Sequence, residues 1–232
     1  MGNIIRVGIV GATVTEGGSG WGANAHVPAL NELPNYKLKA VCTSHEETAR
    51  ASSAKFGADL AFWNMEDMVA SPDVDLVAVV VRVPWHKELV EMAISAGKPV
   101  CCEWPLGADL AEAEEMADKA ARNNLPTLVG LQAQSDPTVM FARDLISNDE
   151  IGDIVTVNLS VMVNAITKRG DGRIWQGIRK NGANPMTIPG GHAIDALCYL
   201  LGEFAEVSAR VTTRIPMWHH SVTGEDFPVD AP

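Results

Sequence analysis

The sequence predicts an α/β protein in which a doubly wound parallel sheet is followed by a smaller α+β domain. Apolar, β-branched runs alternate with stretches of helical periodicity through residues 4–147, the order of elements that builds a parallel sheet. Beyond them, two longer segments alternate apolar and polar residues, as expected of antiparallel strands with one solvated face. We therefore expect a first domain at residues 1–149 and a second at 150–232.

The first domain is expected to alternate strands and helices along its whole length. Strands are predicted at 4–10, 37–43, 60–62, 74–81, 98–103 and 127–132, and helices at 23–33, 46–56, 65–70, 84–96, 109–123 and 136–147. The run at 74–81 is almost entirely apolar, as in a parallel strand covered on both faces. Gly57 and Gly97 are suited to helix ends, whereas Ser44 and Glu47 have the spacing of a capping box at a helix start.

The second domain is expected to contain two long strands at 151–163 and 207–215 and a helix at 190–201. Between them, residues 167–184 are polar, contain glycines and predict an irregular loop. One helix and two strands make an incomplete sheet, so we expect this domain to be truncated. Long unpaired strands promote aggregation, and we expect them to be covered by a partner chain or by further residues.

The composition is typical of a globular protein, with 47% hydrophobic and 20% charged residues in a chain of 232. A formal net charge of −11 argues against binding to nucleic acid or to an anionic membrane surface, because both need basic residues. No apolar run is long enough for a transmembrane helix, and the first residues lack the layout of a signal peptide.

Four cysteines without regular spacing predict reduced thiols and therefore a cytoplasmic protein. Cys101 and Cys102 are adjacent in a predicted strand, so their side chains should point to opposite faces and not to one metal ion. His219 and His220 offer too few ligands for zinc. No metal site is expected.

The turn after the first strand is the strongest functional signal in the sequence. Gly11 follows that strand, and further glycines stand at 17, 18, 20 and 22 before the first helix. Glycines let the backbone approach a pyrophosphate closely, and a helix start favours an anion. Thr13 occupies the position of the second glycine of G-x-G-x-x-G, and an exposed glycine-rich loop is the alternative. We interpret the turn as a dinucleotide site formed by Gly11, Ala12, Thr13, Gly20 and Trp21.

The end of the second strand should meet the adenosine ribose of the dinucleotide. An acid there hydrogen-bonds the 2′-hydroxyl of NAD, whereas small polar or basic residues accommodate the 2′-phosphate of NADP. Thr43 and Ser44 occupy the tip, and the first acid, Glu46, falls on the next helix. This pattern slightly favours NADP, but no arginine adjoins the tip, so both NAD and NADP remain candidates.

The segment at 96–105 reads AGKPVCCEWP and resembles the A-G-K-x-V-x-x-E-K-P segment of the glucose–fructose oxidoreductase and inositol dehydrogenase family. Further matches are Gly8 and Gly11, the helix start at 26–29, residues 74–77, Pro84, His86, and residues 130–132, 151–154 and 191–195. The details are most similar to the branch containing the NAD-binding repressor of the galactose regulon. This resemblance implies a Rossmann domain, a C-terminal open-sheet domain that continues past this chain, and self-association through that sheet.

The resemblance also implies which residues form the site. It assigns Val83, Pro84, His86, Glu103, Trp104 and Gln132 to the cofactor and His192 to catalysis. His86 has the alternative of contributing only its backbone at a helix start, and Glu103 that of a structural hydrogen-bond acceptor. His192 has the alternative of marking a helix entry, with Asp195 one turn on. His26 is expected to be structural.

Two departures from the family bear on its chemistry. The family's dehydrogenases have a lysine beside the nicotinamide and an aspartate four residues before the histidine, whereas this chain has Trp104 and Ile188 there. An indole exchanges no proton, so His192 or the loop at 168–180 would have to do so. The preferred function is hydride exchange between NAD(P) and a secondary alcohol of a sugar, polyol or similar metabolite. The alternatives are a non-catalytic regulator that acts through a protein partner and redox-neutral use of a bound cofactor.

Overall fold

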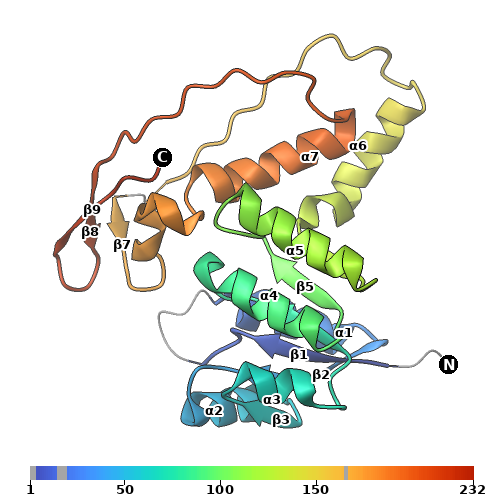
Figure 1. Ribbon diagram of the computed structural model, residues 1–232. Coiled ribbons are helices and arrows are strands. Elements are labelled where there is room, and N and C mark those ends of the chain that lie inside the picture. Colours follow the sequence, from blue (N-terminus) through green and yellow to red (C-terminus); the bar gives the residue numbers. More distant parts are fainter. Residues whose placement is uncertain (1–3, 15–19, 165–166) are drawn as a thin grey trace. The chain divides into compact units, whose positions relative to one another are not determined.

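The computed structural model describes residues 4–14, 20–164 and 167–232 (Figure 1). By its contacts, the chain divides into two compact units. The first comprises residues 1–130 together with 170–173, and the second comprises 131–169 and 174–232. This division falls before the expected boundary at 149/150, because the helix over 137–147 packs against the helix over 191–201.

The first unit is built on a six-stranded sheet in the order β3-β2-β1-β4-β5-β6. Every neighbouring pair in it is parallel. The strands are β1 (Ile5–Val10), β2 (Tyr36–Cys42), β3 (Leu60–Phe62), β4 (Leu76–Val79), β5 (Val100–Glu103) and β6 (Thr127–Gly130). The order reverses between β1 and β4, so the predicted doubly wound sheet is confirmed and its two central strands flank the point where such folds bind ligands.

Helices cover both faces of this sheet. They are α1 (Val27–Glu32) after a π-helical turn at Gly22–His26, α2 (Glu46–Phe56), α3 (Met65–Ala70), α4 (His86–Ser95) and α5 (Leu110–Arg122). One core cluster joins the sheet to α3, α4 and α5 through Met68, Ile94 and Met116, while Val27 of α1 lies in the cluster on the other face. Figure 1 shows these helices around the strands. The helices after β1 and β2 thus lie on one face and those after β3, β4 and β5 on the other, as in a doubly wound sheet.

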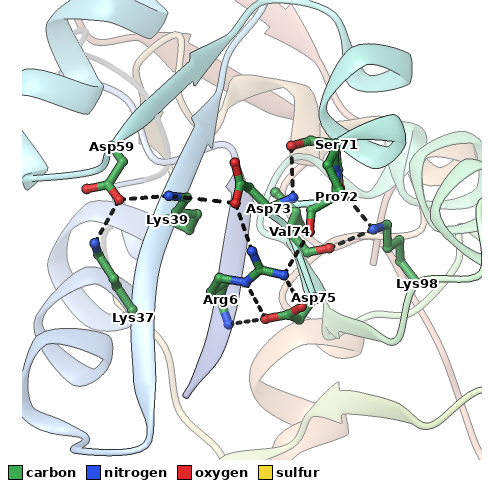
Figure 2. Close-up of polar contacts among 10 residues, drawn as sticks. All are labelled: Arg6, Lys37, Lys39, Asp59, Ser71, Pro72, Asp73, Val74, Asp75 and Lys98. Carbon is green, nitrogen blue, oxygen red and sulfur yellow. Dashed lines mark hydrogen bonds and ion pairs between the residues drawn. The ribbon is translucent and has the colours of Figure 1, made fainter. Parts of the chain in front are cut away.

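A polar network ties the amino ends of four strands together (Figure 2). Arg6 of β1 donates through Nε and Nη2 to the carboxylate of Asp75, at 2.9 and 2.8 Å, and through Nη1 to Asp73 at 2.8 Å. Lys37 and Lys39 of β2 both contact Asp59, at 2.7 and 2.9 Å. Arg6 is partly exposed, so each contact is worth little alone, but together they fix the edge opposite the carboxyl ends of the strands.

Element boundaries in the first unit agree with the predicted ones to within a few residues. Gly57 adopts the left-handed conformation at the end of α2, with φ of 75°, as expected. The capping box is wrong, because α2 begins after His45, which is extended and makes no side-chain cap. Thr43 explains this difference: its hydroxyl contacts that of Thr48 at 2.7 Å and the carbonyl oxygen of His45 at 3.1 Å, which organises the turn before the helix.

The second unit contains α6 (Pro137–Ser147), α7 (Gly191–Leu201) and a three-stranded sheet. Its strands are β7 (Lys168–Arg169), β8 (Met217–His220) and β9 (Asp226–Pro228), in the order β7-β8-β9. β7 and β8 are parallel, whereas β8 and β9 are antiparallel. Trp218 is 2% exposed and forms a small core with Val229 and Ala231. The unit is a small open-sheet α+β structure, as expected.

The prediction of long strands at 151–163 and 207–215 is wrong. Both segments lack strand structure, and no described residue forms a ladder with them. Their apolar side chains lie in solvent; Val155 is 92% and Met162 91% exposed. An alternating pattern specifies a strand only where a partner satisfies its backbone groups, and these segments have none among the described residues. In residues 4–14, 20–164 and 167–232, no helix is long and apolar enough to cross a membrane.

Candidate functional site at the carboxyl edge of the parallel sheet

The parallel register brings most of the predicted site residues of the first unit to one edge. Gly11 directly follows β1, Thr43 follows β2 and Trp104 follows β5, and all three strands run in the same direction. Val83 and Pro84 form a short 3-10 turn between β4 and α4. This edge is where open α/β sheets bind their ligands.

Gly11 is fixed by both its conformation and its packing. It has φ of 101°, which side chains rarely tolerate, and its amide donates to the carbonyl oxygen of Cys42 at 3.2 Å. A Cβ at this position would lie 2.0 Å from the carbonyl oxygen of Val80. The backbone of β1 therefore turns against β2 and β4 at a position that requires glycine.

The following residues keep this turn close to the first helical segment. A Cβ on Gly22 would stand 3.1 Å from the Cα of Ala12, so the helix start packs directly on the turn. The amide of Val14 donates to the buried hydroxyl of Ser52 in α2 at 3.1 Å. Trp21 is 44% exposed, and Gly20 before it has φ of 71°. Gly17 and Gly18 of the predicted turn lie outside the described residues.

His86 is buried between three backbone carbonyl groups. Nδ1 lies 3.0 Å from the carbonyl oxygen of Pro105 and 3.2 Å from that of Leu106, and Nε2 lies 3.1 Å from that of Val81. Burial lowers the pKa of its imidazole, although the carbonyl contacts act in the opposite direction. At 1% exposure, the ring links the end of β4 to the segment after β5. These contacts support the alternative in which the His86 side chain is structural and only its backbone faces the cofactor.

Glu103 ends β5 and is held from two sides. Its Oε1 lies 2.6 Å from Nε2 of His26, with side-chain exposures of 15% and 21%. Gly130 of β6 packs against the same carboxylate, because a Cβ there would meet Oε1 at 2.8 Å. This fit explains the glycine at the end of β6. The expectation that His26 is structural misses this contact, since the two residues are far apart in sequence.

Trp104 is partly buried directly after Glu103, and its peptide bond to Pro105 is cis. Arg82, at the end of the β4 segment, donates from Nη2 to the backbone carbonyl oxygen of Asp171 at 2.9 Å. Residues 170–173 thereby belong to the first unit, although the chain on either side of them belongs to the second. Part of the loop at 168–180 thus contacts the segment that follows β4.

Gln132 and His192 lie in the second unit. Gln132 begins a 3-10 turn over Gln132–Ser135, and His192 is the second residue of α7. These two elements pack against each other, and Gln134 donates to the carboxylate of Asp195 at 2.6 Å. Asp195 therefore contacts the turn after β6. The pairing of His192 with Asp195 stays a prediction.

The chemistry of the carboxyl edge fits a dinucleotide better than a metal ion. The glycine turn, the hydroxyl groups of Thr43 and Ser44 and the partly exposed ring of Trp21 are groups that contact phosphate, ribose and base. Among the described residues, no group of three histidine, cysteine or acidic side chains could hold a metal. Burial raises the pKa of the Cys42 thiol to about 12 and that of Cys101 to about 11, so neither is a nucleophile at neutral pH.

Two family models match the chain, one after the other. Residues 5–131 match the oxidoreductase family with an NAD-binding Rossmann fold. Residues 137–226 match the C-terminal domain of Gal80p. The two matches meet close to the division between the two units at Gly130.

Curated relatives include both enzymes and regulators. Dehydrogenase aclE of Aspergillus oryzae is 35% identical over 91% of this chain and 59% of its own length. The galactose/lactose metabolism regulatory protein GAL80 of Saccharomyces cerevisiae is 29% identical over 91% of this chain and 51% of its own. The chain thus spans about half to three-fifths of the length of these relatives.

Solved structures divide in the same way. A super-repressor mutant of Gal80p from Saccharomyces cerevisiae has a TM-score of 0.86 and 25% identity, covering 100% of this chain and 63% of that one. A levoglucosan dehydrogenase in complex with NADH and L-sorbose has a TM-score of 0.80 and 25% identity, covering 99% of this chain and 61% of that one.

Proposed function

The chain belongs to the oxidoreductase family with an NAD-binding Rossmann fold, and from this we propose that it exchanges hydride between NAD or NADP and a secondary alcohol. The substrate class is a sugar, a polyol or a similar small metabolite. The observation that carries the proposal is Gly11, whose φ of 101° and close approach to Val80 form the turn that such folds use for a pyrophosphate. The levoglucosan dehydrogenase complex with L-sorbose supports a sugar-like substrate.

The bound nicotinamide supplies the hydride chemistry, and the residues of this chain bind and orient. In this proposal, the pyrophosphate of the dinucleotide is held by Gly11, Ala12, Thr13, Gly20 and Trp21. The adenosine ribose is held by Thr43 and Ser44. We assign the nicotinamide side to Val83, Pro84, Glu103, Trp104 and Gln132. His86 keeps the segments after β4 and β5 together through its contacts with the carbonyl groups of Val81 and Pro105.

Proton exchange with the substrate hydroxyl falls to His192 in this proposal. The lysine of related dehydrogenases is replaced by Trp104, and an indole neither gives nor takes a proton at neutral pH. Trp104 can instead stack on a flat ring or a sugar face. A positioned acid or base contributes about 10² to 10⁴ in rate, so loss of the His192 imidazole should be severe.

The test is turnover measured by absorbance of the reduced nicotinamide over a panel of polyols and keto sugars. We expect turnover with at least one compound, and we expect His192→Ala to abolish it while cofactor affinity persists. His219→Ala is the matched control, because that exposed histidine lies in the second unit and contacts Asp226. Equal activity in His192→Ala and the wild type would refute the assigned role.

The second candidate is a non-catalytic, cofactor-binding regulator that acts through a protein partner. Two observations favour it: Trp104 in place of the lysine, and the match of residues 137–226 to the C-terminal domain of Gal80p. Tight cofactor binding without turnover on the whole panel would support it. The turnover assay on the unmodified chain separates the two, because an enzyme converts at least one compound of the panel and a regulator converts none.

We also propose that the second unit mediates self-association and that the protein is cytoplasmic. The exposed apolar side chains of residues 151–163 support an interface, since exposed patches of this kind mark contact surfaces. The four free cysteines support a reducing compartment. Sedimentation velocity over a range of concentrations tests the association, and a monomer at every concentration would contradict it.

A further inference from the structure

Arg50 and Trp63 adjoin the ribose end of the proposed dinucleotide site. The register of β2 and β3 pairs Cys42 with Phe62, so the next residues, Thr43 and Trp63, emerge side by side at the carboxyl edge. The amide of Thr43 donates to the carbonyl oxygen of Phe62 at 3.1 Å, which continues this pairing beyond the ladder. The sequence predicts the strand that Trp63 follows, but only the register of β3 with β2 shows this neighbourhood.

A guanidinium group lies over that tryptophan. The Cζ atom of Arg50, in α2, lies 5.5 Å from the centre of the Trp63 ring, within the range of a cation–π interaction. Both side chains are exposed, Trp63 at 45% and Arg50 at 65%, so solvent and a ligand can reach them. One face of an aromatic ring and one cation thus adjoin Thr43 at the end of β2.

The nearest acid in sequence is already paired with this arginine. Glu46, the first residue of α2, accepts from Nε and Nη2 of Arg50 at 2.9 and 2.7 Å. Its carboxylate thus forms an i, i+4 ion pair with the guanidinium. The tip itself carries Thr43, Ser44 and His45, none of them an acid.

We infer that Arg50, held by Trp63 and Glu46, binds the 2′-phosphate of NADP, and that the protein therefore prefers NADP(H) to NAD(H). A guanidinium matches the geometry of a phosphate group and binds it by charge-assisted hydrogen bonds. The absence of an acid at the strand tip removes the group that would repel the phosphate. The inference rests on the proposed function, since it assigns one end of the same cofactor site.

The experiment measures dissociation constants of NADP⁺, NAD⁺, adenosine 2′,5′-bisphosphate and 5′-AMP by titration calorimetry at fixed ionic strength. The wild type should bind NADP⁺ more tightly than NAD⁺, and the bisphosphate more tightly than 5′-AMP. Arg50→Ala should weaken the two 2′-phosphorylated compounds about 10- to 100-fold and change the other two less than about 2-fold. Glu46→Gln should strengthen the phosphorylated compounds, because it frees the guanidinium and removes a negative charge.

Two further variants serve as controls. Arg122→Ala removes an arginine from the end of α5, where its Nε donates to the carbonyl oxygen of Asp118, and should change none of the four constants. Trp63→Phe should keep the preference for NADP⁺ and Trp63→Leu should reduce it, as expected of a ring that positions Arg50. Circular dichroism spectra equal to that of the wild type show that each variant is folded.

The outcomes separate this inference from the proposed function. Three results would overturn the phosphate contact and leave dinucleotide binding intact. Arg50→Ala could lose affinity for NAD⁺ and NADP⁺ equally or lose neither, or the wild type could prefer NAD⁺. Absence of binding by both dinucleotides overturns the proposed function and this inference together.

Discussion

Substitution of Gly11 by alanine should destabilise the first unit more than the same change at any solvent-exposed glycine turn. The methyl group would stand 2.0 Å from the carbonyl oxygen of Val80 and 2.8 Å from Cγ1 of Val81. The nearest of these atoms is the backbone oxygen of Val80, the residue directly after the central strand β4, so it cannot rotate away. The conformation at φ of 101° adds strain of about 1–3 kcal/mol.

The expected loss in free energy of unfolding combines these two effects. Overpacking against a rigid neighbour costs about 1–3 kcal/mol. Together with the strain, Gly11→Ala should lose about 2–6 kcal/mol, a large part of the total stability of a typical domain. Gly57→Ala is the matched control, because it has φ of 75° but no atom within 4 Å of the place that its Cβ would take. It should lose only the conformational part, about 1–2 kcal/mol.

The assay is urea denaturation of both variants and the wild type, followed by far-ultraviolet circular dichroism. The Gly11→Ala transition should lie at clearly lower urea than that of Gly57→Ala, with dinucleotide binding lost in the first and kept in the second. Equal midpoints for the two variants would refute the claim that the turn is closed by contact with the backbone of Val80.

Three further predictions concern ionisable groups and the exposed segment. Contact with Arg6 lowers the pKa of Asp75 to about 2, so the ionised carboxylate should stabilise the fold fully above its ordinary pKa near 4 and lose this effect as the pH falls towards about 2. Asp75→Asn should therefore weaken the fall in melting temperature at acid pH. An unchanged fall would contradict the assignment to Asp75. Burial lowers the pKa of His86, so the free energy of unfolding should decline below pH 6.5, the ordinary pKa of histidine, as the unfolded chain gains a proton. His86→Phe should remove this decline and cost about 2–3 kcal/mol, because three carbonyl groups lose their hydrogen-bond partner. A decline that persists in the variant would show that another group causes it. Val155→Lys should reduce self-association in sedimentation velocity, because this side chain is 92% exposed in an apolar segment, and an unaltered distribution would remove that segment from the interface.

The parallel sheet could be predicted because each of its strands carries its own signal. An apolar run such as that at 74–81 indicates a covered strand without reference to any neighbour, and Gly57 marks a helix end through its conformational freedom alone. The segments at 151–163 and 207–215 carry an equally clear alternation and form no strand here. The alternation indicates an apolar face, but it does not reveal whether a neighbouring strand is present to pair with the segment.

The candidate site was predictable where it depends on chain order and hidden where it depends on contacts across the sheet. Gly11, Thr43 and Trp104 each follow a strand, so their common edge follows from the parallel order. The contact of Glu103 with His26, at 2.6 Å, joins residues far apart in sequence and could not be predicted from either motif. The i, i+4 spacing of Glu46 and Arg50 was a visible signal, but only the register of β3 shows that Trp63 lies beside them.

Calorimetric titration of the unmodified chain with NAD⁺, NADH, NADP⁺ and NADPH tests the central claim most directly. Saturable binding of one dinucleotide per chain is predicted, with NADP⁺ or NADPH the tightest of the four. No heat of binding with any of them, at concentrations well above the physiological range, would contradict the dinucleotide site on which every functional statement depends.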